Sequence, residues 1–183
     1  MIISFGGLPG AGKSGIAERL ADELGWPHYD LGKVRRQCAH DRGMTMEEYN
    51  TLGETDPSTD TDVDNYQAKL GREQDNFVIV GRTSWHFIPH SLKIFLKART
   101  EVGAQRIIKD LKSRNEPNIK SLDDMMGVLK RRYASDSKRF KEYYGIELYD
   151  DNHYDWTFDT SDVDQETAYQ TVLAYVKTKL SVS

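Results

Sequence analysis

The sequence predicts an α/β fold with a parallel, doubly wound sheet, and three observations carry this prediction. Segments typical of strands and of helices alternate from one end of the chain to the other. Residues 77–80 are apolar at every position, as in parallel strands that are covered on both faces. A glycine-rich turn joins the first strand directly to the first helix. In such folds the ligand site lies at the carboxyl ends of the strands.

The turn after the first strand carries the most specific motif of the chain. It follows an apolar run at residues 2–5 and fits the pattern G-x-x-x-x-G-K-[ST] of a phosphate-binding loop. Its residues are Gly7, Leu8, Pro9, Gly10, Ala11, Gly12, Lys13 and Ser14. Apolar residues then recur at helical spacing from Ile16 to Leu24, and Gly25 ends this helix. A chance match in a glycine-rich turn is the alternative, and the flanking strand and helix argue against it.

Phosphate suits this arrangement chemically. Successive backbone N–H groups form a concave site for oxygens, and the helix N-terminus adds roughly half a positive charge. Lys13 would reach the β- and γ-phosphates of a nucleotide, and the Ser14 hydroxyl would be a Mg²⁺ ligand. We therefore expect the P-loop NTPase fold.

The remaining elements follow in order along the chain. Further strands are expected at residues 26–30, 77–80, 92–96 and 155–159. Gly32 breaks the second strand, and Thr45 caps a short helix with Glu48 as its capping-box partner. Other helices are expected at residues 33–41, 100–112, 122–144 and 164–180, with an acidic helix around residues 54–70. Thr100 and Asp164 are the expected N-caps of two of them.

The segment between the second and third strands is long for a crossover and largely helical. We expect one domain over residues 1–183, with an insertion at about residues 31–74 beside the site. A lid loop is expected at about residues 112–122. The insertion and the lid should close on the nucleotide and exclude water.

Composition limits the classes of partner. The 25 basic residues do not exceed the 29 acidic ones, so the chain lacks the basic excess of a nucleic-acid or membrane binder. Cys38 is the single cysteine, which excludes an internal disulfide and fits a reducing compartment. The first strand leaves no room for a signal peptide, and no apolar run is long enough to span a membrane. We expect a cytoplasmic monomer without nucleic-acid or membrane partners.

Arginines stand at positions where they could meet an anion. Arg36 follows the second strand, and Arg82 follows the third directly. On the long helix a stripe at helical spacing is apolar first and then charged: Leu122, Met125, Leu129, Arg132, Asp136 and Arg139. Two interpretations stay open for the charged part. It is either a solvent-exposed pairing worth little, or a group that enters a cleft and binds phosphate.

Five segments together resemble a known family. They read G-L-P-G-A-G-K-S, Y-D-L-G-K-V-R-R, D-P-S-T-D-T-D-V-D, V-I-V-G-R and R-R-Y-A-S-D-S-K-R-F-K-E-Y-Y-G-I. The chain resembles the cytidylate kinases of the short, archaeal-type branch, which are P-loop nucleoside monophosphate kinases. The likeness runs from residue 2 to about residue 176. It implies transfer of the γ-phosphoryl group of ATP to CMP or dCMP, with Mg²⁺, giving ADP and CDP or dCDP.

The resemblance also implies site residues. Residues 7–14 would bind ATP, and Lys13, Arg132 and Arg139 would be catalytic. The implied monophosphate-binding residues are Asp30, Gly32, Arg36, Asp60, Asp64, Arg82, Arg132, Asp136 and Arg139. Two positions depart from the family pattern. Val80 stands where an acid commonly precedes G-R, and Thr83 replaces the Asp of the bacterial G-R-D, so Asp30 is a candidate to supply the missing acid.

Two other functions stay open. One is another small-molecule kinase on the same scaffold, such as an adenylate-kinase-like enzyme. The other is a nucleotide-switched binding protein. The chain lacks the N-K-x-D motif of a GTPase, and its third strand ends without the acid of a large partner-binding ATPase. Preference between CMP and dCMP is left open by the sequence.

Overall fold

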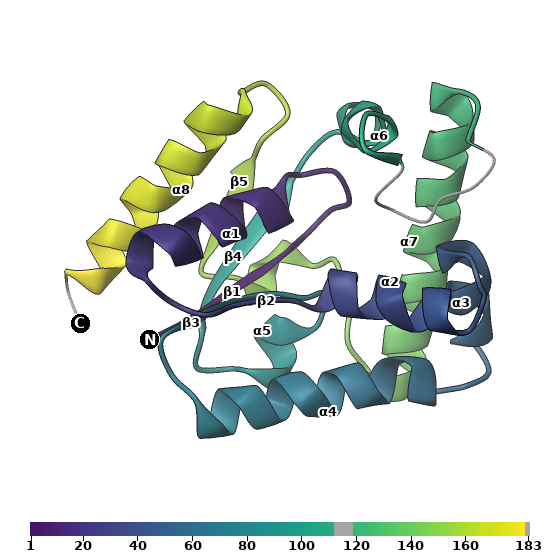
Figure 1. Ribbon diagram of the computed structural model, residues 1–183, viewed down its shortest axis with the longest axis horizontal. Helices are drawn as coiled ribbons and strands as arrows, with labels where there is room; N and C mark the ends of the chain where they lie inside the picture. The colour runs from purple at the N-terminus through teal and green to yellow at the C-terminus, as the bar shows by residue number, and fades with distance from the viewer. Residues whose placement is uncertain (112–118, 182–183) are drawn as a thin grey trace.

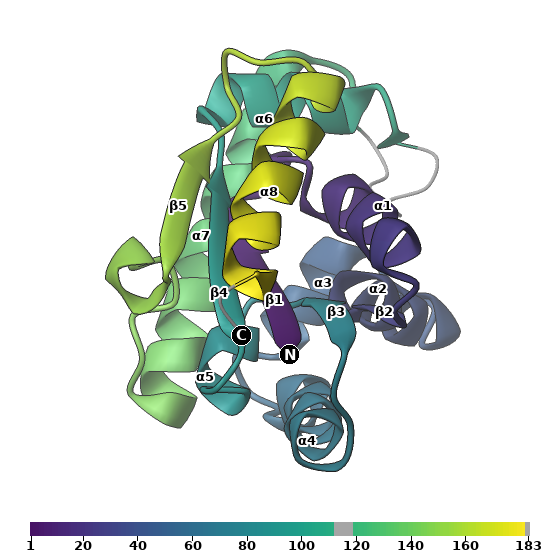
Figure 2. The ribbon, with the colours of Figure 1, turned by 90° about the vertical axis from the view of Figure 1, so that its left-hand side faces the viewer.

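The central element of the fold is a five-stranded parallel sheet in the order β2-β3-β1-β4-β5. The computed structural model describes residues 1–111 and 119–181. The strands are β1 (Ile2–Gly7), β2 (His28–Asp30), β3 (Phe77–Val80), β4 (Leu92–Lys97) and β5 (Trp156–Asp159). Figure 2 views the sheet from its side, with β5 at one edge and β2 at the other. The predicted parallel, doubly wound α/β fold is confirmed.

Helices cover both faces of the sheet. Their bounds are α1 (Lys13–Leu24), α2 (Leu31–Asp41), α3 (Met46–Leu52), α4 (Ser58–Glu73), α5 (Ser84–Phe87), α6 (Thr100–Ile108), α7 (Leu122–Tyr144), η2 (Asp151–His153) and α8 (Gln165–Leu180). In Figure 1, α1 and α8 lie above the sheet, and α4 and α5 lie below it. The helices α2, α3 and α7 gather at one end, beyond the carboxyl end of β2.

Successive side chains of β1 point into the two cores on opposite faces of the sheet, which explains the apolar runs in the strand sequences. Ile3 and Phe5 belong to the core beneath α1 and α8, whereas Ile2 belongs to the core shared with α4 and α5. Along β3, Val78 joins the first core and Ile79 the second. Because both faces are covered, most positions of these strands are apolar, and the buried Ser4 hydroxyl pairs with the Ser91 hydroxyl at 2.7 Å.

Several predicted element boundaries are confirmed and others are wrong. The Thr45–Glu48 capping box, the Asp164 cap and both ends of α7 are confirmed. The second strand ends at Asp30 and α2 begins at Leu31, before Gly32 and the predicted start at residue 33, because Asp30 accepts from the Lys33 N–H at 2.9 Å and caps the helix. Thr100 is not the N-cap of α6, because it is the first residue of the helix and Arg99 precedes it without a side-chain cap bond. The helix ends at Ile108, earlier than the predicted residue 112.

The structure also contains a helix that was not predicted, and one predicted segment lies largely outside the described residues. The short helix α5 was not expected, because four residues are too few for a periodic pattern. The expected lid at about residues 112–122 lies largely outside the described residues. Among the described helices, none has the length and apolar character needed to span a membrane.

Helix α6 packs directly on the backbone of the phosphate-binding loop. A Cβ atom added to Gly103 of α6 would lie 2.6 Å from the Pro9 carbonyl oxygen. A Cβ atom added to Gly10, whose φ is 76°, would lie 2.4 Å from the Gly103 Cα atom. Only glycine pairs allow two backbones to approach so closely. The position of the loop is therefore fixed by α6 as well as by β1.

We expect the Gly103→Ala variant to lose roughly 1–3 kcal/mol of unfolding free energy through overpacking. The same change stabilises an open helix by about 1 kcal/mol, so the sign of the effect is informative. Gly127→Ala in α7 is the control, because its nearest neighbour is the flexible Arg131 Nη1 atom at 3.4 Å. Urea unfolding of both variants measures the difference. Equal stability of the two would contradict the close packing of α6 on the loop.

Candidate active site

The phosphate-binding loop connects β1 to α1 as the motif predicts. The Leu8 N–H donates to the Leu96 carbonyl oxygen of β4 at 2.9 Å, which ties the loop to the sheet. Gly12 immediately precedes α1 with a φ of 87°. Lys13 Nζ donates to the carbonyl oxygens of Leu8 at 2.6 Å and Gly7 at 3.0 Å. The ammonium group therefore lies within the turn of the loop.

A cavity of about 480 Å³ opens over this loop. Every residue of the motif except Leu8 lines it, together with Asp30 at the end of β2 and Arg82 after β3. Tyr149, from the segment after α7, also contributes to its wall. Residues far apart in the sequence thus converge at the carboxyl ends of the strands, as the fold class requires.

A second, smaller cavity of about 80 Å³ lies between the insertion helices and the end of β3. Its apolar lining comes from Leu31, Met46, Val63 and Phe140. Its charged lining comes from Arg35, Arg36, Asp60, Asp64, Arg82 and Arg132. Arg36, Arg82 and Arg132 line both cavities. These three arginines therefore stand at the boundary between the two.

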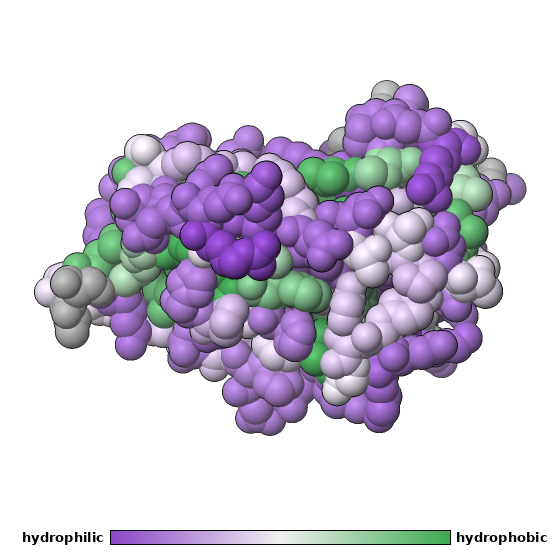
Figure 3. Space-filling view, turned by 90° about the horizontal axis from the view of Figure 1, so that it is seen from below, coloured by the Kyte–Doolittle hydropathy of each residue, from purple (hydrophilic) through white to green (hydrophobic). Residues whose placement is uncertain are grey.

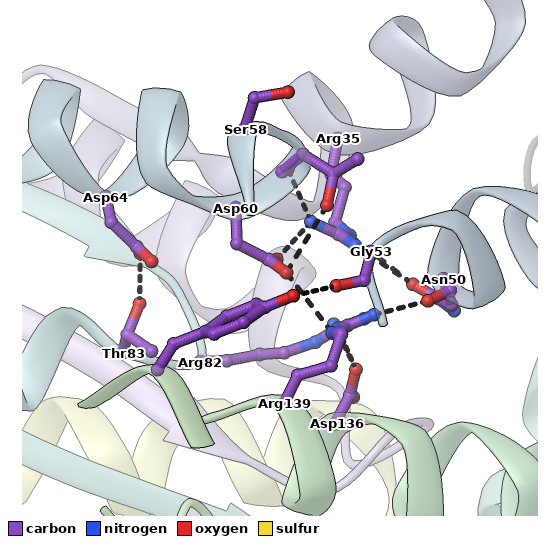
Figure 4. Close-up of polar contacts among 12 residues, drawn as sticks. Arg35, Asn50, Gly53, Ser58, Asp60, Asp64, Arg82, Thr83, Asp136 and Arg139 are labelled. Carbon is purple, nitrogen blue, oxygen red and sulfur yellow. Dashed lines mark hydrogen bonds and ion pairs between the residues drawn. The ribbon is translucent and has the colours of Figure 1, made fainter. Parts of the chain in front are cut away.

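Five charged residues, of which four are buried and Arg82 is partly exposed, form a continuous chain beside this boundary. We call it the arginine–aspartate chain: Arg35, Asp60, Arg139, Asp136 and Arg82. Arg35 pairs with Asp60, and Arg139 Nε lies 3.2 Å from Asp60 Oδ2. Arg139 Nη2 and Arg82 Nη1 each lie 2.7 Å from Asp136 Oδ1. Figure 4 shows Arg139 between the two carboxylates.

Burial decides between the two interpretations of the charged stripe on α7. The exposed fractions are 0% for Asp136 and 1% for Arg139, so the solvent-exposed pairing is wrong. Arg139 Nη1 donates to the Asn50 carbonyl oxygen at 2.8 Å, and its other nitrogens face Asp60 and Asp136. Arg139 lines neither cavity, whereas Arg132, about two turns earlier, lines both. The stripe enters the cleft with Arg132, and the residues after it brace the insertion.

The arginine–aspartate chain carries an excess of positive charge. Three guanidinium groups face two carboxylates, and Arg36 and Arg132 stand beside them. Burial lowers the pKa of Arg35 to about 10, which still leaves it charged at neutral pH. Burial opposes the charge of Arg82 as well, but Asp136 and the other acidic groups around it together outweigh this, and the pKa of Arg82 is raised. An anionic ligand at the boundary would balance this charge.

Asp64 is held by neutral donors instead of arginines. Thr83 Oγ1 and Gln67 Nε2 each lie 2.6 Å from Asp64 Oδ1, and the Tyr144 hydroxyl donates to Asp64 Oδ2 at 2.9 Å. Ser84 in turn donates to Gln67. Burial raises the pKa of Asp64, and these hydrogen bonds act against the shift. Thr83, which stands where an acid was expected, is thus bonded to an acid from α4.

Asp30 has the geometry expected of the missing acid near the loop. It pairs in register with Val80 across β2 and β3, and it lines the same cavity as Ser14. Its Oδ1 atom caps α2, while Oδ2 is buried without a hydrogen-bond partner among the described residues. Oxygen donors of this kind suit Mg²⁺, which is commonly held by one or two side chains and substrate phosphates. Within residues 1–111 and 119–181, no group of three or more His, Cys, Asp or Glu side chains is arranged to hold a metal ion.

The structure adds residues that the sequence analysis did not assign to the site. Arg35 donates to the Thr59 carbonyl oxygen at 2.7 Å besides pairing with Asp60. The sequence contains a signal for Arg35, because it lies four residues from both Leu31 and Ala39, and these three are the buried residues of α2. Tyr149 gave no such signal, since it lies in an irregular segment after α7.

Comparison with known proteins gives sequence relatives over nearly the whole chain. A model of the cytidylate kinase-like family matches residues 2–162. A cytidylate kinase from Methanocella arvoryzae is 35% identical over 161 residues, covering 88% of each chain. A cytidylate kinase from Methanobrevibacter smithii is 31% identical over 177 residues, covering 97% of this chain and 99% of its own.

Solved structures share the fold. A shikimate kinase from Bacteroides thetaiotaomicron superposes with a TM-score of 0.66 at 17% identity, covering 99% of this chain and 98% of its own. An uncharacterized protein from Eubacterium ventriosum superposes with a TM-score of 0.69 at 19% identity, covering 97% of this chain and 98% of its own. At these identities the likeness establishes the P-loop kinase fold and nothing about the acceptor.

We expect two arginines of α7 to behave differently when they are removed. Arg139→Ala leaves Asp60 and Asp136 buried without their shared cation and should lower the unfolding free energy by about 3–5 kcal/mol. Arg132→Ala removes a half-buried cavity residue and should change the unfolding free energy by less than about 1 kcal/mol. Urea unfolding measures both. Similar small losses would show that the arginine–aspartate chain is not the brace described above.

Proposed function

The chain belongs to the cytidylate kinase-like family, and from this premise we propose that it transfers the γ-phosphoryl group of ATP to CMP or dCMP. The products would be ADP and CDP or dCDP. One observation carries the proposal. Arg36, Arg82 and Arg132 line both the cavity over the phosphate-binding loop and the cavity of the insertion. A phosphoryl group passing between two phosphate-bearing ligands needs its positive charges at that boundary.

In the proposed reaction an acceptor phosphate oxygen attacks the γ-phosphorus of ATP. A new P–O bond forms to the acceptor, and the bond to the bridging oxygen of ADP breaks. The acceptor phosphate is already ionised near neutral pH, so no general base is needed. Lys13 and the loop N–H groups would hold the β- and γ-phosphates, while Arg36, Arg82 and Arg132 would hold the acceptor phosphate in line.

Mg²⁺ would be held by Ser14 and Asp30, which line the same cavity. When bound, the ion neutralises charge on the β- and γ-phosphates. The buried Asp30 Oδ2 atom, which has no hydrogen-bond partner among the described residues, supports this assignment. Asp30 would thereby supply the acid that is missing at Val80.

The insertion cavity supports a nucleotide acceptor. Leu31, Met46 and Val63 offer apolar surface to a flat base, and Asp64 offers a fixed acceptor. A carboxylate favours the exocyclic amine of cytosine and repels the carbonyl oxygen at the same position of uracil. Because the cavity holds only about 80 Å³, α2–α4 would have to move outward to admit a nucleotide. We propose this part as the monophosphate-binding region.

Asp60, Asp136 and Arg139 would act as positioning residues in this scheme. They were expected to bind the monophosphate, and Arg139 to be catalytic. Each of them forms ion pairs with other members of the arginine–aspartate chain. Their proposed role is to hold Arg35 and Arg82 in place around the acceptor cavity.

We propose that the protein works as a monomer. Figure 3 shows the face seen from below in Figure 1, where hydrophilic residues dominate and hydrophobic ones appear in narrow strips. Val34 and Tyr66 are the exposed large hydrophobics among the described residues, with 41% and 44% exposure. Isolated residues of this kind do not form a patch that a partner would cover.

ADP release from Mg²⁺–ATP, measured with CMP, dCMP, UMP and AMP in turn, tests the proposed function. We expect CMP or dCMP to stimulate release most strongly. In Lys13→Ala the stimulated rate should fall by about 10²–10³-fold, because a preorganised charge on the phosphates is lost. Circular dichroism should show an intact fold. Strong stimulation by AMP alone would favour an adenylate-kinase-like enzyme, and stimulation by none would favour a nucleotide-switched binding protein.

Asp30→Asn tests the Mg²⁺ assignment separately. Asn keeps the helix cap of α2 but loses the anionic oxygen, so the Mg²⁺ concentration at half-maximal rate should rise about 10-fold or more. Mg²⁺ titration at fixed ATP and CMP concentrations gives this value. Asp22→Asn, an exposed change on α1, is the matched control. An unchanged Mg²⁺ requirement in Asp30→Asn would remove Asp30 from the metal site.

A further inference from the structure

We propose that Tyr149 is a positioning residue that holds the Arg82 guanidinium at the boundary of the two cavities by acting through Asp136. The role of Arg82 in this inference rests on the proposed function. Tyr149 follows the last of the five family-like segments, which ends at Ile146, and no motif points to it. The inference comes from the contacts of its hydroxyl group.

Asp136 is held on both of its oxygens. The Tyr149 hydroxyl donates to Oδ2 at 2.8 Å, while Arg82 Nη1 and Arg139 Nη2 each donate to Oδ1 at 2.7 Å. Both arginines therefore contact one oxygen, and Tyr149 holds the other. Without that hydroxyl, the carboxylate could rotate about its Cβ–Cγ bond, and Arg82 would move with it.

Tyr149 suits this task because it stays neutral. Burial raises its pKa well above the ordinary value, so the phenol remains a hydrogen-bond donor near neutral pH. A third cation on Asp136 would weaken the hold of the carboxylate on Arg82. A neutral donor fixes the orientation of Asp136 without competing with Arg82 for its charge.

The backbone around Tyr149 is anchored well enough to fix the hydroxyl. Gly145 ends α7 with a φ of 69° and turns the chain back along the helix. Ile146 and Leu148 are then buried in a cluster with Trp85 and Phe140. The Tyr149 ring packs on Tyr133 of α7 with a centroid distance of 4.2 Å. The segment thus carries the hydroxyl to Asp136 while Tyr149 itself lines the larger cavity.

Arg82 is the member of the arginine–aspartate chain that can use this hold at the boundary. Its side chain is 26% exposed and lines both cavities, whereas Asp136 and Arg139 are fully buried. The order of contacts therefore runs from Tyr149 through Asp136 to Arg82 and then to the ligand.

The kinetic test uses Tyr149→Phe, which removes only the hydroxyl group. We expect kcat/KM for CMP to fall about tenfold, with little change in KM for ATP and in the melting temperature. In an Arg82→Ala background the same change should have less than about a twofold effect, because the group being positioned is gone. Tyr175→Phe on α8, whose hydroxyl lies 3.5 Å from the Asp155 carbonyl oxygen, is the control for losing a phenol. A full tenfold effect without Arg82, or no kinetic effect with a lowered melting temperature, would overturn the proposal.

A second measurement needs no activity. Arginine side-chain ¹⁵N–¹H spectra of the free protein, assigned with Arg82→Lys, report how firmly Arg82 is held. Its Nε–H signal should exchange faster with water in Tyr149→Phe and stay unchanged in Tyr175→Phe. An unchanged signal in Tyr149→Phe would overturn the positioning role. If no nucleoside monophosphate is phosphorylated, the proposed function fails while this spectrum still decides the role of Tyr149.

Discussion

The contact between Asp136 and its partners is the interaction on which the candidate site depends. Asp136 has no solvent exposure, and it joins the turn after β3, helix α7 and the segment that follows α7. Burying such a carboxylate is unfavourable unless its charge and hydrogen bonds are matched. Apolar residues could stabilise such a position equally well, so stability alone does not account for Asp136, and its proposed role is to hold Arg82 where the two cavities meet.

The same chain of charges connects the insertion to the body of the protein. Arg35 comes from α2, Asp60 from α4 and Arg139 from α7, and each contacts the next. Movement of the insertion helices would change these pairings, so the proposed opening and closing of the insertion would be coupled to the electrostatics of the boundary. Arg36 and Arg132 contribute charge there from the two sides, α2 and α7.

Local patterns predicted the fold and the loop well, because strand, turn and helix of the phosphate-binding motif are adjacent in sequence. They also gave the bounds of α7 and the cap at Asp164. They could not decide what covers the charged stripe on α7, since helical spacing fixes a face and not its neighbour. Arg35 and Asp60 are 25 positions apart, and Thr83 and Asp64 are 19 apart, so neither pairing has a local signal. The roles of the individual site residues stay predictions.

Two carboxylates one turn apart on α4 illustrate how the fold divides the chemistry. Asp60 faces two arginines, Arg35 and Arg139, and its charge is largely balanced by them. Asp64 accepts hydrogen bonds from the neutral groups of Thr83, Gln67 and Tyr144, and none of the ion pairs within residues 1–111 and 119–181 includes it. A carboxylate that is not ion-paired is the better acceptor for a neutral amine. A carboxylate that is ion-paired is the better support for arginines that hold phosphate. Under the proposed function, α4 would thus make up for the threonine at position 83, because Thr83 donates to Asp64 and Asp64 would be the acceptor for the base.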